Sequence, residues 1–276
     1  MKQSRITTVI GMLAGLAILG GAAWYLFRPS PSVEDAVPTP PAVNTTAGPA
    51  QSGGQSDASS IATDQPEADV HAVDPTLIAR KLPPLEQSDA AAWSMLTSLF
   101  NPQTVLDLIV QQQVVQRAVT LIDGLTQAEV DPTVSVLRPV PGAFRVAQPA
   151  GGQTVISLIN AQRYGRYVDA FVTADAHAVV QSYRAAYPLF QAAYVELGYP
   201  HGHFNARLIQ VIDHLLATPR VSAPVAVRRD ERGRYEFSDP QLQSRSIGQK
   251  ALLRMATEQA DAVKDQLRKI RTALLS

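Results

Sequence analysis

The histidines and acids between residues 201 and 214 are the side chains of this sequence best suited to chemistry. His201 and His203 are separated by one residue, and Asp213 and His214 follow further along the chain. Zinc needs three or four nitrogen or oxygen ligands that converge at about 2.0–2.2 Å. A helix rises about 1.5 Å per residue, so His214 should lie about 15 Å from the histidine pair. We therefore predict no metal site here, and the sequence indicates no cofactor.

Asp213 and His214 also raise an alternative hypothesis, a hydrolase or metal-dependent enzyme that uses them with neighbouring polar residues. A serine hydrolase needs a nucleophile, a histidine base and an acid that orients the base. Adjacent residues of a helix point about 100° apart, so Asp213 is badly placed to orient His214. The sequence contains no nucleophile elbow, no phosphate-binding loop and no cysteine. We assign no catalytic residues and keep the enzyme as the alternative.

Tyrosines at helical spacing suggest a second kind of site. Rings that recur every three or four residues usually form a core, but the tyrosine hydroxyl also suits an open groove for a peptide, a glycan or a partner helix. Both interpretations stay open at this point. The candidate binding groove comprises Tyr183, Tyr187, Tyr194, Tyr199, Asn205, Arg207, Asp213 and His214.

The densest basic cluster lies in the last quarter of the chain. It consists of Arg228, Arg229, Arg232 and Arg234, and two acids interrupt it. On an exposed hairpin these arginines could contact anionic lipid headgroups or an acidic partner, or they could form a solvated turn. The net charge of the whole chain is zero, which argues against nucleic acid as a partner.

Two helices joined by a turn must position most of these residues. Apolar side chains repeat at steps of three and four over residues 183–197 and again over residues 204–215, which predicts two amphipathic helices. Gly198 should end the first helix. Asp175 is suited to cap its start, and Pro188 should bend it. The sequence thus predicts a helical hairpin whose apolar faces meet.

The surrounding residues predict a mainly α fold. We expect one compact domain over residues 88–276, with six or seven helices and two small β-hairpins. One apolar stripe predicts a single helix that starts at Pro102 and ends near Gly124. The expected hairpins pair residues 144–146 with 154–158 and residues 225–227 with 235–237.

The N-terminal region predicts a membrane anchor. Residues Ile6 to Phe27 form a run of 22 uncharged residues, and a helix of that length spans about 33 Å, enough to cross a bilayer. Cations in residues 1–5 place the N-terminus in the cytoplasm by the positive-inside rule. Gly11 and Gly15 form a GxxxG pair that could support a homodimer.

Two further interpretations concern this end of the chain. The small residues 21–23 leave open a cleaved signal peptide in place of an anchor. Residues 28–87 are rich in proline, alanine and serine and contain few residues able to form a core. Such a segment cannot offset the entropy of ordering, so we expect a disordered linker between the membrane and the domain.

Several short motifs resemble a bacterial family, the domain-of-unknown-function family 3014. The resemblance extends from about Trp93 to the end of the chain, and it implies a preceding membrane segment and a proline-rich linker. No activity is established for the family, so the resemblance supplies no catalytic residues. The motifs that carry it are residues 187–191, 196–200, 204–205, 211–219, 235–237, 239–240, 248–250 and 252–255.

These observations together lead to one functional expectation. The chain should be a single-pass protein of the bacterial inner membrane, with residues 28–276 in the periplasm. Without an evident catalytic set, the helical domain should act as an interaction module. Its expected partner is an unidentified envelope protein or a glycan.

Overall fold

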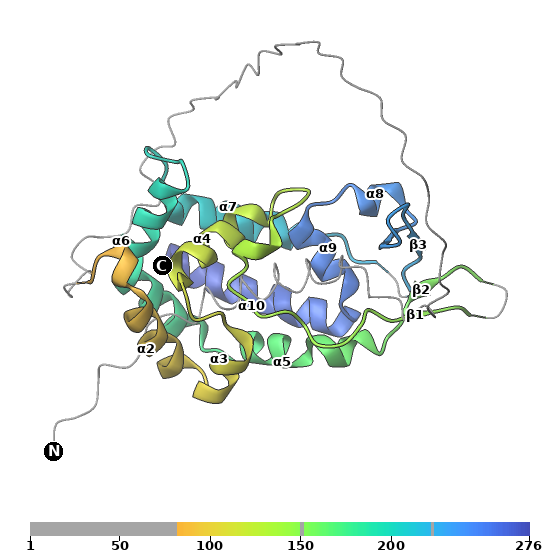
Figure 1. Cartoon of the computed structure of the whole chain (residues 1–276), viewed down its shortest axis with the longest axis horizontal. Coiled ribbons are helices and arrows are strands. Elements are labelled where there is room, and N and C mark those ends of the chain that lie inside the picture. The colour runs from red at the N-terminus through yellow and green to blue at the C-terminus, as the bar shows by residue number, and fades with distance from the viewer. Residues whose placement is uncertain (1–81, 150–151, 222–223) are drawn as a thin grey trace, which may run out of the picture. The chain divides into compact units, whose positions relative to one another are not determined.

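Helices dominate the part of the chain that the computed structural model describes, namely residues 82–149, 152–221 and 224–276 (Figure 1). This confirms the mainly α fold. The described residues form nine α-helices, more than the six or seven expected. The helices are α2 (Asp89–Leu99), α3 (Pro102–Leu108), α4 (Val114–Gly124), α5 (Asn160–Val172), α6 (Ala176–Glu196), α7 (Phe204–Leu216), α8 (Pro240–Gln243), α9 (Ile247–Arg254) and α10 (Thr257–Leu275), with short 3-10 turns at Leu85–Gln87 and Pro132–Val134.

The single helix expected over residues 102–124 is wrong, because the chain breaks between α3 and α4. Ile109 forms a β-bridge with Leu137, which takes the backbone out of the helix. Gln113 adopts a left-handed conformation with a φ of 52°, uncommon for a residue other than glycine. The apolar stripe runs through both helices, so helical periodicity alone did not reveal the break.

Asp89 stabilises the N-terminus of α4. Its two carboxylate oxygens accept hydrogen bonds from the backbone N–H groups of Gln113 and Val114, each at 2.9 Å. A negative charge at a helix N-terminus also interacts favourably with the helix dipole. The first residue of α2 therefore caps α4, which fixes these two helices relative to each other.

The expected helical hairpin is confirmed as α6 and α7. Asp175 caps α6 by accepting a hydrogen bond from the N–H of Ala178, and Pro188 lies inside the helix. Gly198 follows the end of α6 with a φ of 113°, a conformation that favours glycine. Helix α10 packs against α5, α6 and α7 and lies in the middle of the helices (Figure 1).

Both expected β-hairpins are present at one end of the helices (Figure 1). They consist of strands β1 (Val146–Ala147) and β2 (Val155–Ile156), and of β3 (Val227–Arg229) and β4 (Tyr235–Phe237). A bridge between Val155 and Ala226 joins the two hairpins. The N–H of Ile156 donates to Val225 at 2.9 Å, and the N–H of Val227 donates to Thr154 at 2.8 Å. The hairpins thus form one small antiparallel assembly.

The predictions for the N-terminal region fall almost entirely outside the described residues. These are the cytoplasmic residues 1–5, the membrane helix Ile6 to Phe27, the GxxxG pair and most of the linker 28–87. Within residues 82–149, 152–221 and 224–276, no helix is long and apolar enough to cross a membrane. Leu85 is buried in the main core, so ordered packing begins before the expected boundary at residue 88.

Candidate interaction surface

The three tyrosines of α6 that were expected to line a groove are buried. Tyr183, Tyr187 and Tyr194 expose 8% of their surface or less, and they belong to the main apolar core. Tyr183 packs edge-on against Tyr187, with ring centroids 5.8 Å apart. Burial raises the pKa of Tyr183 well above its usual value. Because α4, α7 and α10 cover α6, its aromatic stripe forms core and offers no open groove.

Two of the remaining expected groove residues, Tyr199 and Arg207, contact Asp123 of α4. Asn205 is buried. The guanidinium of Arg207 forms an ion pair with Asp123 at 2.7 Å and donates to the hydroxyl of Thr126 at 2.7 Å. Tyr199 is more exposed, and its hydroxyl lies 3.4 Å from the carboxylate of Asp123. These contacts give the group a structural role.

Asp213 and His214 point to different partners. The carboxylate of Asp213 forms an ion pair with Arg271 of α10. The Nε2 atom of His214 lies 2.7 Å from the hydroxyl of Ser246. Ser246 in turn caps α9 by accepting a hydrogen bond from the N–H of Gln249. Since Asp213 is engaged by Arg271, it does not orient His214, and the three residues form no catalytic triad.

The surroundings of His214 favour its neutral form. Burial lowers the pKa of its imidazole, and the nearby cations Arg207 and Arg245 lower it further. A neutral ring can accept a hydrogen bond from the Ser246 hydroxyl at Nε2. In the part of the chain that the structure describes, no three histidine or acidic side chains converge as metal ligands.

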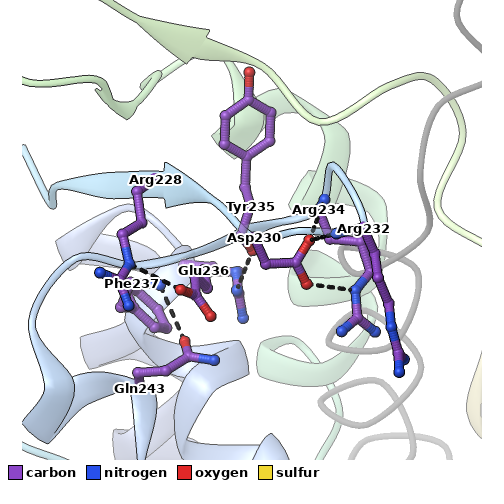
Figure 2. A network of polar contacts seen from close by, with 9 residues as sticks. Arg228, Asp230, Arg232, Arg234, Tyr235, Glu236, Phe237 and Gln243 are labelled. Atoms are coloured by element: carbon purple, nitrogen blue, oxygen red, sulfur yellow. Dashed lines mark hydrogen bonds and ion pairs between the residues drawn. The ribbon is translucent and has the colours of Figure 1, made fainter.

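Two of the four arginines in the basic cluster of the β3–β4 hairpin pair with acids (Figure 2). Arg228 pairs with Glu236 on the neighbouring strand, and Arg234 pairs with Asp230, each at 2.8 Å. Burial raises the pKa of Asp230, but hydrogen bonds from Arg234 outweigh this and hold the pKa below its usual value. Only part of the positive charge of the cluster is therefore left to attract an anion.

The two remaining arginines of the cluster are exposed. The guanidinium of Arg229 lies over the ring of Tyr235, 5.0 Å from the centroid. Tyr235 also contacts Phe144, with the ring centroids 5.9 Å apart. The backbone N–H of Arg232 donates to the Asp230 carboxylate at 3.0 Å, but in the described part of the chain its guanidinium forms no ion pair. An anionic contact through this hairpin thus depends on Arg229 and Arg232.

The outer edge of β4 is closed by side chains. The N–H of Phe237 donates to Gln243 at 3.0 Å (Figure 2). The buried guanidinium of Arg254 donates to the carbonyl of Tyr235 at 3.3 Å. Arg254 also lies 4.6 Å from the centroid of the Phe237 ring, and burial lowers its pKa to about 10. The edge therefore cannot accept an additional strand from a partner.

The loop that follows β2 presents an apolar surface that was not expected from the sequence. Leu158 and Ile159 expose 69% and 53% of their surface, the largest values among the exposed large apolar residues of the described chain. Leu158 was expected inside a strand, but β2 ends at Ile156. A pair of adjacent apolar residues gives no sequence signal that separates an exposed loop from a buried strand.

A partly open hollow adjoins this loop. Leu158 and Ile156 line one side of it, and the remaining lining is also largely apolar. A second hollow continues from it along α9 and α10 and shares part of its wall. Residues common to both hollows are Val225, Leu253 and Met255. Exposed and partly exposed apolar side chains thus cluster where the two hairpins meet the helices.

These features define a mainly α-helical domain that carries two linked β-hairpins and an exposed apolar loop at one end. The chain belongs to a family described as "Protein of unknown function (DUF3014)", whose family model matches residues 114–271, more than half of its length. The matched range covers α4 to most of α10 and includes both hairpins. No curated protein and no solved structure matches the chain.

Proposed function

We propose that the chain is a membrane-anchored, non-enzymatic interaction module of the bacterial cell envelope. The uncharged run from Ile6 to Phe27 supports an inner-membrane anchor, and the charges that flank it support a periplasmic domain. The buried tyrosines of α6 cannot serve as the contact surface. We assign that role to residues 157–160, together with the adjoining hollow.

The exposure of Leu158 and Ile159 is the observation that carries this proposal. Single exposed apolar residues are common on protein surfaces, but here two lie side by side next to an apolar hollow. Their exposure is costly in water, and contact with a partner removes that cost.

A photoreactive residue placed in intact cells tests the contact surface. Substitution at Leu158 should give a reproducible crosslink to an envelope component. The matched control is Val195 on α6, which is apolar and 41% exposed but lies on another element. Equal yields at both positions, or no crosslink at Leu158, would contradict the proposed surface.

A reporter at the C-terminus tests the placement separately. An enzyme that is active only outside the cytoplasm should be active when it is fused after Ser276, because the anchor exports everything that follows it. A fusion that is active only in the cytoplasm would refute the envelope location without touching the assignment of the contact surface.

A further inference from the structure

The segment that contains the exposed loop is rich in positive charge. Residues 132–168 contain four arginines and no aspartate or glutamate. Arg166 pairs with Asp107, but Arg163 donates hydrogen bonds to two backbone carbonyls, which do not neutralise its charge. Among the described residues, no carboxylate pairs with Arg145, whose side chain is exposed. Apolar side chains and cations therefore occur together at this surface.

The loop is held in place by Asn160, which is buried. Its amide nitrogen donates to the carbonyl groups of Arg145 and Ser157, each at 2.7 Å, and its amide oxygen accepts from the N–H of Arg145 at 3.0 Å. The guanidinium of Arg163 reaches the same amide oxygen at 3.2 Å. A satisfied buried side chain thus fixes the backbone that presents the apolar pair, which lowers the entropy lost on contact.

We propose that the 157–160 loop docks onto an anionic phospholipid surface. Leu158 and Ile159 enter the boundary between headgroups and acyl chains, while Arg145 and Arg163 lie near the lipid phosphates. Apolar residues flanked by arginines suit this boundary, because the acyl chains are apolar and the headgroups above them carry negative charge. The proposal rests on the membrane anchor of the proposed function and names the partner of the same surface.

Because the domain is tethered to the membrane, a small contact area is enough for the loop to dock on the bilayer. Two apolar side chains and a few arginines bind a bilayer weakly, as a single lipid anchor does. A domain tethered to the same membrane meets its surface at an effective concentration on the order of millimolar, so weak docking becomes populated. An acidic protein is the other partner that these charges would suit, and the experiment below separates the two.

The absence of cysteine from the chain allows a clean probe of docking. The full chain with Leu158→Cys, labelled with an environment-sensitive fluorophore, is reconstituted into vesicles that contain a nitroxide lipid as quencher. The vesicles consist of phosphatidylcholine alone or of phosphatidylcholine with phosphatidylglycerol. We expect strong quenching in the anionic vesicles and weak quenching in the neutral ones. The same label at Val195→Cys should be quenched in neither.

Charge variants complete the test. Arg145→Gln should weaken quenching of the Leu158 label several-fold in anionic vesicles, whereas Arg268→Gln, which removes a surface cation of α10, should leave it unchanged. Docking is refuted if the Leu158 label is not quenched although the chain floats with the vesicles. It is also refuted if the label responds only when an acidic envelope protein is added.

Different results refute the membrane anchor and the docking surface. A chain that is released from vesicles by alkaline washing contradicts the anchor of the proposed function. In that case, anionic vesicles are added at a lipid concentration on the order of millimolar, which matches the effective concentration of a tethered domain. Quenching of the Leu158 label would then still support docking, and its absence would refute it.

Discussion

Single polar side chains bind neighbouring elements of the described domain to each other. Asn160 joins the end of the loop after β2 to Arg145, the residue before β1, and Asp89 joins α2 to the start of α4. His214 links the end of α7 to Ser246, the residue that caps α9. At each of these points a buried or half-buried polar group has a partner, which removes the cost of taking it out of water.

The stability of the domain should depend on pH through His214. Its pKa in the folded state lies below the ordinary value of 6.5, so the folded state binds fewer protons than the unfolded state. The stability that this residue contributes is complete above about pH 6.5 and is lost as the pH falls through its folded-state pKa. Urea unfolding of the wild type should therefore show lower stability at about pH 5 than at about pH 7.5.

Substitution identifies the residue responsible. His214→Gln removes the titrating group, so its loss of stability between the two pH values should be smaller than that of the wild type. His177→Gln, on the exposed side of α6, should retain the wild-type dependence. An identical pH dependence in His214→Gln and the wild type would show that His214 does not titrate during unfolding.

The α6–α7 hairpin depends on one side chain that the sequence did not single out as a connector. The amide oxygen of Gln191 accepts hydrogen bonds from the hydroxyl of Tyr187 at 2.7 Å and from the N–H of Phe204, the first residue of α7, at 2.9 Å. Its amide nitrogen donates to the carbonyl of Gly202 at 2.7 Å. Gln191 therefore caps α7 from α6 and fixes the turn between them.

Removal of this connection should destabilise the domain. Gln191→Ala leaves the N–H of Phe204 without its acceptor and removes the acceptor of the Tyr187 hydroxyl proton, so we expect a loss of about 1–3 kcal/mol in the free energy of unfolding. Gln181→Ala, at an exposed site of the same helix, should change it by less than about 0.5 kcal/mol. Urea denaturation measures both values, and equal effects would refute the assigned role.

Elements with strong local signals were predictable from the sequence. The α6–α7 pair, the cap at Asp175 and both hairpins follow from apolar periodicity and turn residues. The break between α3 and α4 was not predictable, because it depends on the bridge from Ile109 to Leu137, a contact between distant segments. Local patterns do not report such contacts.

Prediction of the site was limited for the same reason, because local sequence patterns do not report contacts between distant segments. A stripe of tyrosines has the same spacing whether other helices cover it or not, and here α4, α7 and α10 cover it. The arginines of the second hairpin were correctly placed on a hairpin, but their pairing with Glu236 and Asp230 depends on strand register. The exposed loop at Leu158 depends on the hydrogen bonds of Asn160, which strand periodicity does not encode.

At the scale of the whole molecule, Gly248 determines how closely α9 approaches α4. Its N–H donates to the carbonyl of Leu125 at 3.0 Å. A Cβ atom at this position would lie 2.8 Å from that carbonyl oxygen and 2.6 Å from a methyl group of Leu215. Since a backbone carbonyl cannot move aside cheaply, a side chain here would push the two helices apart.

Two glycine substitutions with opposite expected signs test this packing. Gly248→Ala should lower the free energy of unfolding by roughly 1–3 kcal/mol through steric overlap. Gly165→Ala in α5 should raise it by about 0.5–1 kcal/mol, because a Cβ there meets only the Asp169 carboxylate at 4.0 Å and alanine favours helix. Thermal or urea unfolding measures the stability of both variants. An unchanged free energy of unfolding in Gly248→Ala would show that α9 can shift to accommodate the side chain.

The bridge between the two hairpins imposes an order on the biogenesis of the chain. β2 is synthesised before α5, α6 and α7, whereas Val225 and Val227, which bond to its neighbouring residues, are synthesised after them. A nascent or truncated chain that ends before residue 225 leaves the Ile156 amide and the Thr154 carbonyl without these partners. The bridge at the end of the domain that carries Leu158 can therefore form only after the ribosome has delivered the three intervening helices.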